Sequence, residues 1–107
     1  MATPLGDKIR QLRKEKGLTL EKLADLTESS KSYIWELENK DLPRPSADKV
    51  GRIAAILGVT SEFLIDSSVD SPTPDVVDKA FFRKYEKMTP DVKEKIRSIV
   101  DAWDKQK

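Results

Sequence analysis

The chain has 107 residues, about one domain's worth, of which 36% are charged and 37% hydrophobic, a balance that favours short amphipathic helices around one small core. It contains no Cys and no His, which excludes disulfides, most metal sites and most catalytic triads, so we expect no metal, no cofactor and no enzyme activity. No apolar run approaches the roughly 18 residues of a membrane span, and the first residues do not resemble a signal peptide, so we expect a cytoplasmic protein without a membrane segment.

The first predicted helix spans residues 4–16. Leu5, Ile9 and Leu12 recur at intervals of four and three residues, which places them on one buried face. Gly17 follows directly and is typical of a residue that ends a helix.

Two further short helices are predicted on either side of a turn at residues 27–30. Thr19 is a good N-cap for the second helix, and Ser29 or Ser30 can cap the third, which runs to about Asn39. The inward-facing positions are Leu23, Ala24, Ile34 and Leu37, with Leu20 as a further candidate.

A fourth and a fifth helix follow an extended loop at residues 42–46, where two prolines disfavour helical geometry. Ser46 caps the fourth helix, Gly58 ends it, and Thr60 caps the fifth. The buried positions of these two helices are predicted to be Val50, Ile53, Ala54, Leu57, Phe63 and Leu64.

The rest of the chain predicts a linker and two more helices. Thr73 with Pro74, and Thr89 with Pro90, each indicate a helix start, because threonine caps a helix and proline fits its first position. The fold class is therefore all-α, with an N-terminal unit at residues 1–66, a linker at 67–73 and a C-terminal helical segment at 74–107.

The second and third helices together form a helix-turn-helix pattern. Two short helices joined by a tight turn are typical of a motif whose second helix lies in the major groove of DNA. Ala24 allows the two helices to cross closely. Net charge does not add support for DNA binding. The chain carries +1 overall, and residues 1–66 carry 11 Lys or Arg against 11 Asp or Glu.

Three blocks of the chain resemble the Cro/CI-type (XRE) family of phage and bacterial repressors. They are LTLEKLA at residues 18–24, SKSYIWELEN at 30–39 and IAAILGVTSEFL at 53–64, in the same order as in that family. The resemblance covers residues 5–65. It implies a five-helix, lambda-repressor-like DNA-binding domain, here followed by two C-terminal helices.

The resemblance also implies which residues read bases. These positions lie at the start and middle of the recognition helix and are occupied by Lys31, Ser32, Trp35 and Glu36. Lysine suits O6 and N7 of guanine, and glutamate can accept from N4 of cytosine. Trp35 has the alternative of packing against another part of the protein.

Further roles follow from the same resemblance. The implied phosphate contacts are Thr19, Ser30, Tyr33, Asn39, Lys40 and Arg44, with plain loop charge as the alternative for Arg44. A buried pair of Arg13 with Glu38 is implied, which fixes geometry more than it stabilises. The basic stretch at residues 8–16 is expected to be solvated surface or to flank the phosphates.

Two positions depart from the family pattern. Leu20 stands where the family usually has a glutamine that contacts phosphate, and Glu28 stands where the turn usually has glycine. Leucine cannot donate to a phosphate. Glutamate must either give up the left-handed conformation or hold it at a cost in free energy.

An apolar stripe marks the last helix. Its residues recur three to four apart and must be buried against something: Val92, Ile96, Ile99, Val100 and Trp103. We favour a homodimer interface, because a repressor that reads a palindrome needs a self-complementary contact. Packing on the chain's own N-terminal unit and binding of another protein are the alternatives.

These observations predict a homodimeric, nucleoid-associated repressor that occupies an inverted-repeat operator in double-stranded DNA. The alternative function is an antitoxin or adaptor whose C-terminal helices bind a protein partner.

Overall fold

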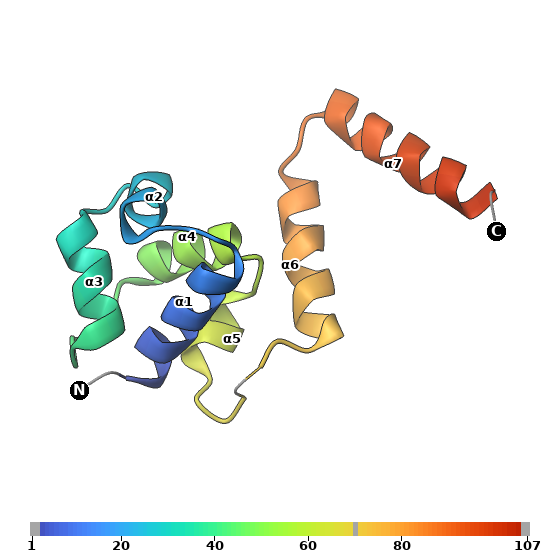
Figure 1. The fold of residues 1–107 in the computed structure, drawn as a ribbon. Helices are drawn as coiled ribbons and strands as arrows, with labels where there is room; N and C mark the ends of the chain where they lie inside the picture. Colours follow the sequence, from blue (N-terminus) through green and yellow to red (C-terminus); the bar gives the residue numbers. More distant parts are fainter. Residues whose placement is uncertain (1–2, 70, 106–107) are drawn as a thin grey trace.

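The computed structural model describes residues 3–69 and 71–105, with side chains as far as residue 104. Its helices are α1 (Pro4–Glu15), α2 (Leu20–Leu26), α3 (Lys31–Asn39), α4 (Ala47–Leu57), α5 (Ser61–Ile65), α6 (Pro74–Glu86) and α7 (Pro90–Lys105). Figure 1 shows α1 to α5 gathered into one body, with α6 beside it and α7 extending away. The predicted all-α fold is confirmed. The predicted N-terminal unit, linker and C-terminal segment include residues 1–2, 70 and 106–107, which lie outside the described residues.

The helices begin where hydroxyl side chains can satisfy free backbone N–H groups. In each of the seven described helices the cap oxygen accepts a hydrogen bond from the N–H three residues further on. Helix α3 is capped by Ser30 and not by Ser29. These caps are Thr3, Thr19, Ser30, Ser46, Thr60, Thr73 and Thr89.

One hydrophobic core lies among the five helices α1 to α5. The side chains predicted to face inward supply most of it. Leu5 and Leu20 are only half-buried and pack against this core from its edge. The buried apolar side chains are Ile9, Leu12, Leu23, Ala24, Ile34, Leu37, Val50, Ile53, Ala54, Leu57, Val59, Phe63 and Leu64.

Helix α1 packs closely against the C-terminal end of α3. A Cβ atom added at Gly6 would lie 2.2 Å from the carbonyl oxygen of Leu37, so only glycine permits this approach. Nearby, Nε of Arg13 lies 2.7 Å from Oε2 of Glu38, and Nη2 lies 3.0 Å from Oε1. Arg13 also donates from Nη1 to the carbonyl of Leu18 at 2.9 Å. The Glu38 carboxylate is almost fully buried, so this two-point ion pair satisfies a charge that water cannot reach.

Lys8 contradicts the expectation of solvated surface for the basic stretch. Its side chain is buried, and its Nζ donates to the carbonyls of Phe63 and Asp66 at the end of α5. The same Nζ lies 4.4 Å from the centroid of the Phe63 ring. A cation at a helix C-terminus satisfies carbonyls that lack intrahelical partners, so Lys8 fixes α5 against α1.

The C-terminal helices differ in how they meet the rest of the chain. Helix α6 contacts the N-terminal body. Val76 packs at the edge of the core, and Nη1 of Arg83 lies 3.0 Å from Oε2 of Glu62. Helix α7 extends away from that body (Figure 1). No described helix is long and apolar enough to cross a bilayer.

Replacing Arg13 by methionine should leave the Glu38 carboxylate buried without a partner. We expect the free energy of unfolding in urea to fall by about 3–5 kcal/mol. A double variant, Arg13→Met with Glu38→Met, removes both charges and should recover most of this loss. An equal loss in the two variants would show that packing at this site matters and the charge pairing does not.

Candidate nucleic-acid interface

Helix α3 divides its residues between the core and the solvent. Ile34 and Leu37 are buried against the other helices. On its outer side lies an open hollow of about 410 Å³, lined by Lys31, Ser32, Trp35, Glu36 and Lys40. The structure thus brings all four predicted base-reading side chains together around one solvent-facing surface.

Trp35 forms part of this outer surface. Its side chain is 45% exposed, and Nζ of Lys40 lies 5.8 Å from the centroid of its ring. Tryptophan side chains are on average highly buried in folded proteins, so an exposure this large is uncommon. Its flat apolar face is available to a ligand lying along α3.

Of the predicted phosphate-contacting residues, Lys40 also lines this hollow, and some of the others already use polar atoms within the chain. The Ser30 hydroxyl accepts from the N–H of Tyr33 at 3.0 Å, and the Asn39 amide donates to the carbonyl of Trp35 at 2.9 Å. Thr19 caps α2 in the same way as Ser30 caps α3. Lys40 and Arg44 are exposed.

Tyr33 is half-buried at the edge of the core. Burial raises the pKa of its phenol, because the low-dielectric surroundings disfavour the phenolate. A phenol is protonated at neutral pH even without this shift, so the hydroxyl can donate a hydrogen bond. Nζ of Lys49 lies 5.9 Å from the centroid of its ring.

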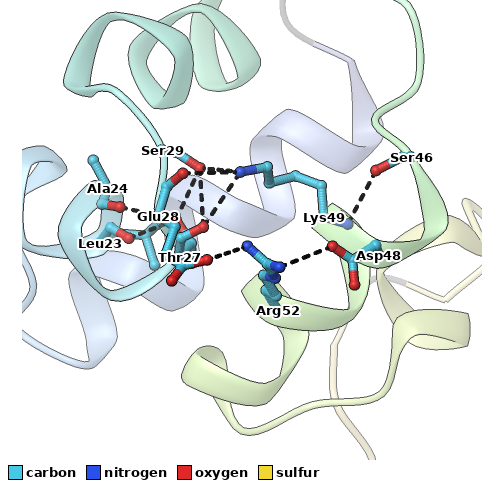
Figure 2. A network of polar contacts seen from close by, with 9 residues as sticks. All are labelled: Leu23, Ala24, Thr27, Glu28, Ser29, Ser46, Asp48, Lys49 and Arg52. Atoms are coloured by element: carbon cyan, nitrogen blue, oxygen red, sulfur yellow. Dashed lines mark hydrogen bonds and ion pairs between the residues drawn. The ribbon is translucent and has the colours of Figure 1, made fainter.

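The turn between α2 and α3 contains a strained residue. Glu28 has φ of +56°, the left-handed region that side chains disfavour. An arginine of α4 holds its carboxylate: Nη1 of Arg52 lies 2.5 Å from Oε2 of Glu28, and Nη2 lies 3.2 Å from Asp48 (Figure 2).

Lys49 binds the same turn from α4. Its Nζ donates to Oγ of Ser29 at 2.7 Å and to the carbonyls of Thr27 and Glu28 at 3.3 and 3.4 Å (Figure 2). The buried Thr27 hydroxyl donates to the carbonyl of Leu23 at 2.8 Å. These contacts fix the turn, and so the start of α3, relative to α4.

Sequence reasoning missed this network. The spacing of Asp48 and Arg52 is typical of a helical i,i+4 pair. The partners in the turn, however, lie 20 to 24 residues away in the chain, and no local pattern indicates them.

The family described as "Helix-turn-helix domain" matches residues 4–64, which include α1 to α4 and most of α5. This chain belongs to that family. Its helix-turn-helix domain is of the XRE type, the family whose sequence blocks it resembles.

Two curated relatives of this helix-turn-helix chain are the HTH-type transcriptional regulators SinR of Bacillus subtilis (strain 168) and Bacillus licheniformis. They are 36% and 34% identical to it over 62 residues. The match covers 58% of this chain and 56% of each relative, so the chain spans about half the length of the curated relatives.

Three solved structures are similar to this helix-turn-helix chain. The master regulator for biofilm formation SinR in complex with DNA is 35% identical with a TM-score of 0.55, covering 58% of this chain and 98% of that one. A SinR protein/SinI protein complex is 25% identical with a TM-score of 0.58, covering 96% and 99%. The clp gene regulator ClgR from Corynebacterium glutamicum is 19% identical with a TM-score of 0.54, covering 92% and 87%, and shows the fold alone.

The structure gives a physical account of the two departures from the family pattern. Leu20 packs its half-buried side chain against the edge of the core, a contact to which leucine is suited. Glu28 keeps the left-handed backbone conformation, and Arg52 offsets part of the cost by pairing with its carboxylate.

Two substitutions at Glu28 should separate the backbone strain from the ion pair. Glu28→Ala and Glu28→Gly both remove the carboxylate, but only glycine tolerates φ of +56° without strain. We expect the glycine variant to be more stable than the alanine variant by about 1 kcal/mol in urea unfolding. If alanine matched or exceeded glycine, the turn would not hold a left-handed residue at this position.

Proposed function

We propose that this protein is a homodimeric transcriptional repressor that occupies an inverted-repeat operator in double-stranded DNA. Helix α3 lies in the major groove of each half-site, and the half-sites are about one helical turn or a simple multiple apart. The protein acts in the cytoplasm, bound to the nucleoid.

The observation that carries this proposal is the outer surface of α3. Lys31, Ser32, Trp35 and Glu36 line one open hollow, while the opposite face of the same helix is locked into the core. An exposed polar face on a rigidly held helix is what base reading requires. The similarity to a SinR structure in complex with DNA over residues of the same domain supports it.

Base and backbone contacts have separate roles in the proposal. Lys31 donates to O6 and N7 of guanine, and Glu36 accepts from N4 of cytosine. Phosphate contacts fix the register without reading sequence. We assign them to Thr19, Ser30, Tyr33, Asn39, Lys40 and Arg44.

The dimer contact lies on α7. Val92, Ile99, Val100 and Trp103 are 40%, 59%, 58% and 67% exposed in the single chain, and Ile96 lies half-buried among them. An apolar stripe this exposed is typical of an interaction surface. A second copy offers the same stripe, which suits a two-fold interface.

Lys31→Ala tests base reading. An operator is first selected from random DNA, and the affinity for it and for scrambled DNA is measured by fluorescence anisotropy. Loss of a guanine contact should weaken operator binding by about 1–3 kcal/mol and leave scrambled DNA nearly unaffected. Lys79→Ala, on α6, is the control and should change neither affinity. Equal weakening on both DNAs would make Lys31 a phosphate contact.

The dimer is tested by Ile96→Asp with Trp103→Ala. Sedimentation velocity should show the wild-type chain as a dimer and the double variant as a monomer, because a buried carboxylate disfavours the apolar contact. Glu94→Ala with Asp101→Ala, which fall on the opposite face of α7 by helical spacing, should remain dimeric. A double variant that keeps the dimer mass would refute the assignment.

A second function is supported by one specific observation. The SinR protein/SinI protein complex matches nearly the whole chain, including α6 and α7, so a similar helical segment occurs in a protein that binds another protein. In this alternative, the stripe on α7 binds a protein partner. A partner that co-purifies in stoichiometric amount and is lost with Ile96→Asp would favour it.

A further inference from the structure

A cleft lies between α6 and the outer face of α4. Its volume is about 580 Å³, within the range of small-molecule sites, and it lies where two units of the chain meet, as such sites often do. Its smallest lining residues are Gly51, Ala54 and Ala55 of α4, here called its floor, and Ala80 of α6. None of the residues proposed to contact DNA or to form the dimer lines it.

Gly51 is unexplained by the fold itself. A glycine inside a helix is destabilising relative to alanine. Here its φ is not in the left-handed region, and an added Cβ would meet only Oγ of Ser61 at 3.8 Å, an ordinary contact. Neither backbone conformation nor packing within the chain requires glycine, yet its absent side chain keeps the floor of the cleft open.

The cleft is positively charged, although the chain is nearly neutral. Four cationic side chains line it against one carboxylate, that of Asp48. Arg52 pairs with Asp48 and Glu28, and Arg83 pairs with Glu62. Lys84 and Lys87 form no ion pair within the described residues. The cleft therefore has a small apolar floor and, on its rim, two lysines whose charge no ion pair of the described residues neutralises.

We propose that this cleft binds a small anionic amphiphile, with its carboxylate between Lys84 and Lys87 and its apolar body over Gly51 and Ala54. Charge complementarity selects the anion, and the apolar floor selects an acid with a hydrocarbon body over a bare ion. DNA is a poor candidate, because α3 and α6 lie on opposite sides of α4 (Figure 1).

The test uses the full chain and decanoate below its micelle-forming concentration. Calorimetry should show one site per chain, and amide NMR shifts should concentrate at Gly51, Ala54 and Ala80. Acetate has the charge without the tail, and decyltrimethylammonium has the tail with the opposite charge, so both should bind at least about tenfold more weakly. Equal binding of either compound would overturn the proposal.

Three variants test the location of the site. Gly51→Leu fills the floor, and Lys84→Gln with Lys87→Gln removes the unpaired charges; each should weaken decanoate binding at least about tenfold. Lys79→Gln with Lys95→Gln removes two lysines outside the cleft and should leave binding unchanged. Circular dichroism checks that Gly51→Leu folds, and the lysine variant tests the site independently of that change.

Unchanged binding in the cleft variants, or shifts concentrated at Ile99 and Trp103 of α7, would refute the site. A change in sedimentation mass with Gly51→Leu would instead mark the cleft as a contact between copies and also refute it.

Discussion

The buried ion pair between Arg13 and Glu38 is the contact on which the position of α3 depends. A helix of nine residues has one inward face, and here Ile34 and Leu37 use it. Apolar packing alone lets a short helix slide or rotate, whereas a two-point ion pair in a dry site defines one orientation. Gly6 brings α1 close enough to fit beside it. The pair fixes the C-terminal end of α3, and Lys49 and Arg52 fix the turn before it.

Holding α3 in this way uses many of the positive charges of the N-terminal unit. Lys8, Arg13, Lys49 and Arg52 all bind carbonyls or carboxylates of the chain itself. The cations left on the outer side of α3 and in the loop after it are Lys31, Lys40 and Arg44. This division explains why the net charge does not indicate a nucleic-acid-binding surface. Oppositely charged residues cancel in the total, while their placement leaves positive charge where α3 faces solvent.

The features that could be predicted from sequence are local ones. Caps such as Thr19 and Ser46 act on N–H groups three residues away, and the core positions follow helical spacing, so both can be read from neighbouring residues. The contacts of Lys8 and Lys49 could not be predicted, because their partners lie 55 to 58 and 20 to 22 residues away. The pairing of Arg13 with Glu38 came from family resemblance, and no spacing rule links residues 25 apart.

The least constrained part of the molecule is the junction between its two units. Helix α6 meets the N-terminal body through Val76 and through an ion pair of Arg83 with Glu62, whose side chains are both largely exposed. An exposed pair of this kind contributes at most about 1 kcal/mol. If α7 joins two copies and α3 reads DNA, the distance between the two recognition helices depends on this weak junction. Because the cationic cleft lies at the same junction, a ligand bound there would contact both sides and restrict their relative orientation. Half-site spacing and occupation of the cleft are therefore expected to depend on the same few contacts of α6.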